Sequence, residues 1–175
     1  EAFNTAVGHN AGREITTGDS NTLIGALAGD ALTEGTDNVV VGKSSLSADT
    51  LGSRSVALGK NTLSAQNFTS ATNVYNTAVG HDAGKAVTTG VKNTLIGGLA
   101  GDAITTGANN VALGFEALSA NTGSNGNVAI GYESLETFNV TSDTTTFNTA
   151  VGTQAGKAVT TGIQNTLIGG LAGDA

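Results

Sequence analysis

The chain of 175 residues contains 26 glycines, 27 threonines and 17 asparagines, and it has no proline, cysteine, methionine or tryptophan. Only 12% of its residues are charged and 4% are aromatic. It is therefore too uncharged for a solvated disordered segment and too poor in large apolar side chains for a conventional core. The net charge of −7 disfavours a nucleic-acid-binding surface, and no apolar run approaches the ~20 residues of a membrane-spanning helix.

A five-residue block, Asn-(Thr/Val)-aliphatic-aliphatic-Gly, recurs ten times along the chain. Successive blocks follow one another in steps of 17, 17, 17 and 21, so the whole pattern repeats with a superperiod of 72. Residues 76–103 match residues 148–175 at 24 of 28 positions. We therefore predict a single repeat array over residues 1–175, with superrepeats 4–75 and 76–147 and a partial superrepeat 148–175. We expect this array to be a window of a longer one.

The repeat length favours a β-solenoid over helical repeats. Blocks rich in β-branched residues and interrupted by glycine oppose helix formation, and the repeat unit is too short for a two-helix hairpin. Two strands of about five residues plus two turns use up one such unit at ~3.3 Å per residue. Stacked about 4.8 Å apart, ten coils give a rod on the order of 45 Å long. We predict an all-β fold, a parallel β-roll with one 17- or 21-residue unit per coil.

Two block positions recur so strictly that they predict structural columns along the rod. Glycine in every block predicts a backbone with positive φ or a wall too close for a side chain. Asparagine predicts a ladder in which each amide bonds to its copies above and below; asparagines that only form turns are the alternative. The glycine column is Gly8, Gly25, Gly42, Gly59, Gly80, Gly97, Gly114, Gly131, Gly152 and Gly169. The asparagine column is Asn4, Asn21, Asn38, Asn76, Asn93, Asn110, Asn127, Asn148 and Asn165, with Ser55 in the fourth block.

The strand in each block is apolar on both of its faces, as in residues 110–114 and 127–131. Side chains alternate across a strand, so a coil encloses only one face, and the other must meet a partner. We therefore expect a homo-oligomer whose block strands meet along a common axis. A monomer with a half-exposed Val/Ile stripe is the alternative, because threonines soften that face.

The motifs SVALGKNTLSA, NVALGFEALSA and NVAIGYESLET resemble the head repeats of trimeric autotransporter adhesins. The units NTAVGHDAG and NTLIGGLAG resemble the Asn/Thr/Gly-rich repeats of bacterial surface proteins and phage tail fibres. The resemblance covers the whole chain, although both the shorter and the longer unit exceed the usual adhesin-head unit in length. It implies a left-handed parallel β-roll, usually trimeric, that serves as an extracellular stalk or adhesive head.

Candidate catalytic, cofactor-binding and metal-binding residues are not apparent. His9 and His81 share a repeat position that holds threonine in the third copy, which indicates solvated surface side chains. Three aspartates recur too far apart to share an ion, at Asp30, Asp102 and Asp174. No nucleophile, base and orienting group recur together. We predict that the chain is not an enzyme and carries no cofactor or metal.

The 21-residue coils contain four extra residues within 66–75 and 138–147, which are expected to bulge from the rod as loops. Both loops carry an Asn-x-Thr sequon, at Asn67 and Asn139, which are candidate glycosylation sites. Both end in an aromatic residue, Tyr75 or Phe147, matched by Phe3. We expect these aromatics to clamp the loop base onto the rod, with ligand binding as the alternative.

Phe115 and Tyr132 occupy one repeat position in successive coils. Together with Tyr75 and Phe147 they are candidate surface-contact residues, because an aromatic ridge on the rod would be exposed.

A structural or adhesive extracellular fibre segment, on a cell surface or a virion, is the favoured function. Its expected partners are copies of itself, as a homotrimer or a filament, and host or surface glycans; nucleic acid and membrane insertion are not expected. One alternative is a sugar- or surface-binding tail-fibre module that uses the long-coil loops. Another is a filament subunit that stacks end to end. An ice-binding solenoid ranks low, because threonine in the second block position gives way to valine in the third and fourth blocks.

Overall fold

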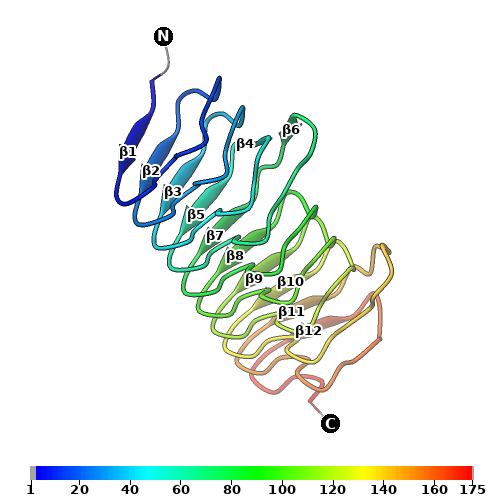
Figure 1. The fold of residues 1–175 in the computed structure, drawn as a ribbon. Coiled ribbons are helices and arrows are strands. Elements are labelled where there is room, and N and C mark those ends of the chain that lie inside the picture. The colour runs from blue at the N-terminus through cyan, green and yellow to red at the C-terminus, as the bar shows by residue number, and fades with distance from the viewer. Residues whose placement is uncertain (1–2, 175) are drawn as a thin grey trace.

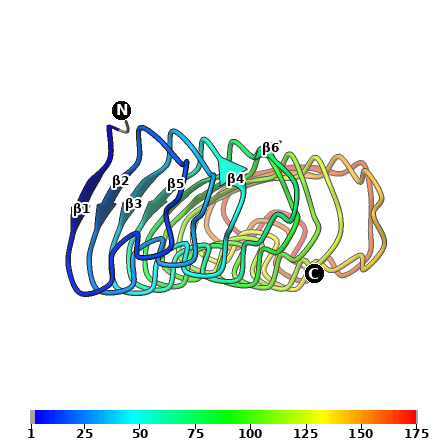
Figure 2. The same ribbon diagram turned by 45° about the horizontal axis from the view of Figure 1, so that its top comes forward.

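Each repeat block forms one short strand in the computed structural model, which describes residues 3–174. The coils follow one another along a single rod from the N-terminus to the C-terminus (Figure 1), and Figure 2 shows them one behind another. The ten block strands are β1 (Thr5–Val7), β2 (Thr22–Ile24), β3 (Val39–Val41), β5 (Val56–Leu58), β7 (Thr77–Val79), β8 (Thr94–Ile96), β9 (Val111–Leu113), β10 (Val128–Ile130), β11 (Thr149–Val151) and β12 (Thr166–Ile168).

These strands make one parallel ten-stranded sheet in the order of the chain. Equivalent block positions pair with each other, so Ala78 faces Leu95 and Val79 faces Ile96 across β7 and β8. The strand that follows a 21-residue coil keeps the same register, because β5 pairs β7 in the same way. The all-β solenoid with about ten coils is therefore confirmed.

The predicted pair of five-residue strands in each coil is wrong. Each block contributes a strand of three residues, and the only other strands in residues 3–174 are β4 (Gly52–Ser53) and β6 (Thr72–Asn73). The reason is that most of each coil consists of turns, and 22 non-glycine residues within residues 3–174 have positive φ. They recur just before eight of the ten blocks and two or four residues after the block glycine, as Lys92, Leu99 and Leu118 illustrate. A left-handed residue ends a strand.

The block glycines have both predicted properties. Gly97 has φ +135°, and a Cβ placed on it would lie 2.4 Å from the carbonyl oxygen of Gly114 in the next coil. The same close approach recurs along the column, for example from Gly114 to Gly131 at 2.3 Å. A side chain at this position would meet backbone, so glycine is required for the coils to stack.

The interior is filled by leucines that enter from two different places. The middle residue of each block strand points inward, and it is fully buried in β2 through β11. In β8 this middle residue is Leu95. A Cβ placed on Gly84 would lie 2.7 Å from a Leu95 methyl group, and a Cβ placed on Gly101 would lie 2.8 Å from the other. In β9 the middle residue is Ala112, and the interior is filled instead by Leu118 from the following turn, which is fully buried. One strand leucine thus fills the interior space beside two turn glycines, one in its own coil and one in the coil before.

Candidate functional site

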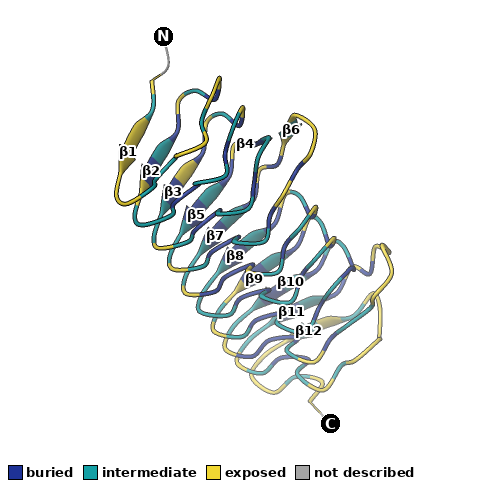
Figure 3. Ribbon diagram, viewed as in Figure 1, coloured by how far each residue is buried: buried dark blue, intermediate teal, exposed yellow. Residues whose placement is uncertain are grey.

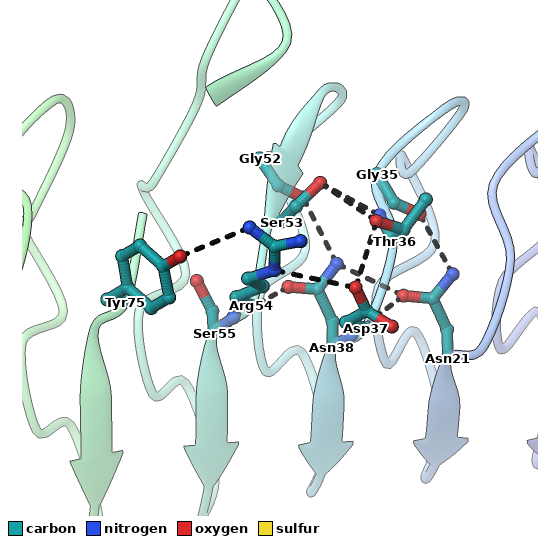
Figure 4. A network of polar contacts seen from close by, with 10 residues as sticks. All are labelled: Asn21, Gly35, Thr36, Asp37, Asn38, Gly52, Ser53, Arg54, Ser55 and Tyr75. Atoms are coloured by element: carbon teal, nitrogen blue, oxygen red, sulfur yellow. Dashed lines mark hydrogen bonds and ion pairs between the residues drawn. The ribbon is translucent and has the colours of Figure 1, made fainter. Parts of the chain in front are cut away.

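The asparagine column forms the predicted ladder at the start of the block strands. Asn110 donates from its backbone N and its Nδ2 to Oδ1 of Asn93, at 3.0 and 3.2 Å. Its Nδ2 also donates to the carbonyl oxygen of Ser124, at 2.9 Å, which closes its own coil. Asn127 continues the ladder by donating its backbone N to Oδ1 of Asn110 at 3.0 Å. Figure 4 shows this arrangement at Asn21 and Asn38. The ladder therefore joins neighbouring coils and fixes the turn within each one.

The ladder is interrupted at Ser55, and a residue from the first long coil fills the gap. Gln66 is fully buried, and its Nε2 donates to Ser55 Oγ at 3.1 Å. Its Oε1 accepts a hydrogen bond from Asn76 Nδ2 at 2.9 Å. Gln66 thus supplies the amide that serine lacks, so the row of hydrogen bonds continues into the second superrepeat.

A buried carboxylate, Asp49, lies directly beside this glutamine. Its oxygens accept hydrogen bonds from Gln66 Nε2 at 2.6 Å and from the backbone N of Gly52 and of Phe68, both at 3.1 Å. Burial raises the pKa of Asp49, and these hydrogen bonds oppose that shift. The carboxylate therefore attaches the first long coil to the coil before it.

Sequence reasoning missed this buried polar pair, although a signal was present. Most coils have an apolar residue at the same distance from the start of the block, such as Leu32, Val87 and Ile104. The appearance of Asp49 and then Gln66 in a mainly apolar column indicates a specific hydrogen-bonded contact rather than ordinary packing.

The second long coil is anchored by packing at the equivalent place. Phe138 stands where the first superrepeat has Gln66, and it is fully buried. Asn127 keeps the ladder intact there and accepts a hydrogen bond from Thr146 Oγ1 at 2.7 Å. In the first long coil the aromatic anchor is Phe68, which is only 8% exposed. These two phenylalanines, and not the aromatics that end each loop, are the buried aromatic anchors of the long coils.

Both long coils bulge from the same side of the rod (Figure 1). Each returns by parallel pairing with the coil before it, through Ser53 and Asn73 in the first and through an isolated bridge between Asn125 and Thr145 in the second.

The sequon asparagines stand where the shorter coils have threonine, and they take part in a second ladder. Thr33 Oγ1 donates to the carbonyl oxygen of Thr50 at 3.1 Å. At the second long coil Thr122 Oγ1 donates instead to Asn139 Oδ1 at 2.9 Å. At the first, Thr50 Oγ1 has two acceptors, the Phe68 carbonyl oxygen at 2.9 Å and Asn67 Oδ1 at 3.2 Å. These bonds occupy the amide oxygen, whereas a glycan is attached to the nitrogen. Asn67 is exposed and Asn139 half-buried, so glycosylation stays a prediction that favours Asn67.

The candidate surface aromatics lie at the two ends of the block strands. Tyr75 precedes β7 and lies under the Arg54 guanidinium, 5.7 Å from carbon to ring centroid, and Arg54 also donates to its hydroxyl at 3.1 Å. Phe115 and Tyr132 follow β9 and β10 and stack with ring centroids 5.9 Å apart. All three, like Phe147, are exposed over about half of their surface or more.

The outer face of the ten-stranded sheet is uncharged along the whole rod, with threonine or valine at the first strand position and Val, Ile or Leu at the third. The first and third residues of each strand point outward, and several are exposed, including Val7, Ile24 and Leu113. Figure 3 shows the mixture of buried and exposed segments along the sheet. None of the ten blocks contains a charged residue. Ten of the twelve exposed large apolar side chains lie on this face or on the residues that flank it. The exposed apolar surface is therefore gathered on one side of the rod.

Charged residues gather instead at a corner of the coils, beyond the carboxyl ends of the strands. Gln154 Nε2 donates to Glu133 at 2.9 Å, and Lys157 pairs with both Glu133 and Glu136. These hydrogen bonds lower the pKa of Glu133 to about 2 and raise the pKa of Lys157. A groove of about 480 Å³ beside this cluster is lined by Asp102, among others, and burial raises the pKa of that carboxyl.

The described part of the chain has neither a metal-binding cluster nor a membrane-spanning helix. Within residues 3–174, no three His, Cys, Asp or Glu side chains are arranged to hold a metal ion. The same residues include no helix long and apolar enough to cross a membrane. Neither a family model, nor a curated protein, nor a solved structure matches the chain.

Proposed function

We propose that the chain is a structural segment of an extracellular fibre, on a cell surface or a virion, in which three copies pack their sheets around a common axis. The observation that carries the proposal is the outer sheet face. Its third strand position is Val, Ile or Leu in all ten coils, its first is threonine or valine, and no charged residue lies in any block. Charged residues elsewhere give each chain a net charge of −7, so copies can approach at low electrostatic cost only through such an uncharged surface.

The size of the face suits a stable assembly. Ten strands about 4.8 Å apart and blocks of five residues cover on the order of 750 Å², and a typical specific interface buries about 800 Å² per partner. A second copy repeats at the same strand spacing, so a contact made by one coil can recur in every coil along the rod. The resemblance to trimeric adhesin heads favours three copies and a stalk or adhesive role.

The mass of the assembly in solution tests the proposal. Light scattering coupled to size-exclusion chromatography should give three times the mass of one chain. The variant Ile96→Asp/Leu113→Asp places two charges on the outer face of neighbouring strands and should run as a folded monomer. Its matched control is Thr89→Asp/Thr106→Asp, which adds the same charges at exposed positions away from the sheet and should stay trimeric. A monomeric parent would overturn the proposal.

The in-register threonines of the same face favour a second candidate, binding to ice. Thr77 and Thr94 are neighbours on the face, as are Thr5 and Thr22, but valines separate these pairs. Thermal hysteresis in a monomeric parent would support this function; a trimer without hysteresis would exclude it.

A further inference from the structure

We infer that the chain binds an acidic polysaccharide along the row of residues that directly follow the block glycines. This row lies outside the blocks, at the rim of the outer sheet face. From the third coil to the eighth it consists of Lys43, Lys60, His81, Gly98, Phe115 and Tyr132. The inference goes beyond the structural role proposed above, and it is carried by the residues of a single chain.

Backbone hydrogen bonds hold these six residues in one line. The N–H of Asn61 donates to the carbonyl oxygen of Lys43 at 3.0 Å, and the N–H of Glu133 donates in the same way to Phe115 at 2.9 Å. Each such bond sets the residue after one row member against the row member of the coil before. With coils about 4.8 Å apart, the row is about 24 Å long. A chain-like ligand can therefore contact it at several points.

The first half of the row lies in the positively charged part of an acidic chain. Residues 43–92 contain five of the seven Lys and Arg residues and only two of the fourteen Asp and Glu residues. Both of those carboxylates, Asp49 and Asp82, are buried. The segments on either side hold the other twelve acidic residues and only two basic ones. At physiological salt charges interact over only about 8 Å, so a ligand responds to this local sign.

The lysines of the row are free to bind an anion. Lys43 and Lys60 are exposed neighbours, and neither takes part in an ion pair within residues 3–174. Two like charges in adjacent coils repel each other, and an anionic group between them would remove that repulsion. His81 is the next row member, and the carboxylate beside it, Asp82, is already paired with Lys85 at 3.2 Å. This half of the row is thus open to carboxylate or sulfate groups.

The second half of the row offers aromatic surface. Phe115 and Tyr132 stack with their planes 12° apart, and they are 45% and 47% exposed. Exposed aromatic rings can pack against the apolar C–H groups of a sugar, and the tyrosine hydroxyl can bond to a sugar hydroxyl. Glu116 directly follows Phe115, so this end of the row suits an uncharged part of the ligand. Acidic groups and sugar rings in one chain define an acidic polysaccharide.

Single-stranded nucleic acid also combines anionic groups with flat rings, but it fits this row less well. Its bases bind proteins by stacking on open aromatic faces. Here the two rings stack on each other, and the ring of Phe115 also lies against Gly98, where an added Cβ would be 3.4 Å from a ring carbon. A base would have to separate these contacts, whereas a sugar can lie on the surface that they leave exposed.

Binding of the assembled parent protein to immobilised polymers at about 0.15 M salt tests the inference, with biolayer interferometry as the readout. Heparin presents sulfate and carboxylate groups, polygalacturonate presents carboxylates alone, and dextran is uncharged. The parent should bind one or both acidic polymers and should not bind dextran. Binding to neither acidic polymer, equal binding to dextran, or tighter binding to single-stranded poly(dT) would overturn the inference.

A charge variant locates the basic half of the site. Lys43→Ser/Lys60→Ser should weaken binding about tenfold, because two exposed ion pairs are lost, and should reduce its dependence on salt. The matched control Thr89→Asp/Thr106→Asp changes the net charge by the same amount at exposed positions outside the row and should bind as the parent does. An equal loss in both variants would show that only the net charge matters, and would overturn the inference.

An aromatic variant tests the other half. Phe115→Ser/Tyr132→Ser should weaken binding several-fold, by a factor that stays the same as salt is raised, because the lost contact is uncharged. An unchanged affinity would overturn the assignment to a polysaccharide. Circular dichroism shows whether each variant keeps the parent fold. Light scattering on the same samples separates the two proposals: a monomeric parent that binds would overturn the trimer alone, and a trimer that binds no acidic polymer would overturn this inference alone.

Discussion

The alternation between strand and turn leucines makes a quantitative prediction about the core. Leu95 is fully buried and lies against glycines of two coils, Gly84 and Gly101. Leu95→Ala should leave a cavity that neither glycine can fill, because a glycine has no side chain to move into it. Core Leu→Ala substitutions cost about 2–5 kcal/mol of unfolding free energy, and we expect about 4 kcal/mol here, near the upper end.

A second substitution should repair this cavity. Gly101 has φ +55°, the conformation in which Leu118 sits one coil later. Gly101→Leu alone should cost about 1–3 kcal/mol, because its Cβ would lie 2.8 Å from side-chain carbons of Ile104 and Leu95. Leu95→Ala/Gly101→Leu gives this coil the combination already present at Ala112 and Leu118. The double variant should be at least about 2 kcal/mol more stable than the two single losses added together.

Urea unfolding followed by circular dichroism measures these four proteins, all at one chain concentration because association adds to apparent stability. If the loss of unfolding free energy in the double variant equals the sum of the two single losses, the idea that one leucine position substitutes for the other is refuted.

Three further outcomes are expected. Gly97→Ala should cost roughly 3 kcal/mol or more or prevent folding, because its φ is +135° and its Cβ would meet the Gly114 carbonyl oxygen at 2.4 Å; Gly98→Ala, whose nearest neighbour would be a ring carbon at 3.4 Å, should change the urea midpoint little. Asn110→Ala should cost about 3 kcal/mol by leaving buried ladder groups unpaired, and an unchanged midpoint would count against the ladder. Glu133 has its pKa lowered from 4.5 to about 2, so its stabilising contribution is complete above the unfolded value and is lost as the pH falls from about 4.5 towards 2; Glu133→Gln should flatten the melting temperature over that pH range, and an unaltered slope would argue against the pairing.

Much of the coil was predictable because its causes lie within one repeat unit. The positions of Gly97 and Asn110 in every block are enough to predict close stacking and an amide ladder. The short strands were not predictable, because residues such as Leu99 and Glu116 adopt positive φ although their side chains disfavour it. Stacking between coils compensates for that local cost. The propensity of a single residue does not predict this stacking.

Part of the surface was also predictable from the repeat unit. An uncharged outer face follows from strand alternation, and the exposed aromatics Phe115 and Tyr132 occupy the same repeat position in successive coils. The contact between Asp49 and Gln66 joins residues of adjacent coils, and it becomes visible only when the coils are aligned as columns.

The ladders described above run along the rod, so tension applied to the two ends of the chain would load one coil at a time. A terminal coil held by a single neighbour would detach before the next one feels the force. Each detached short coil would add about 60 Å of chain length, and each long coil about 75 Å. The chain would thus lengthen in regular steps and absorb mechanical work at each one.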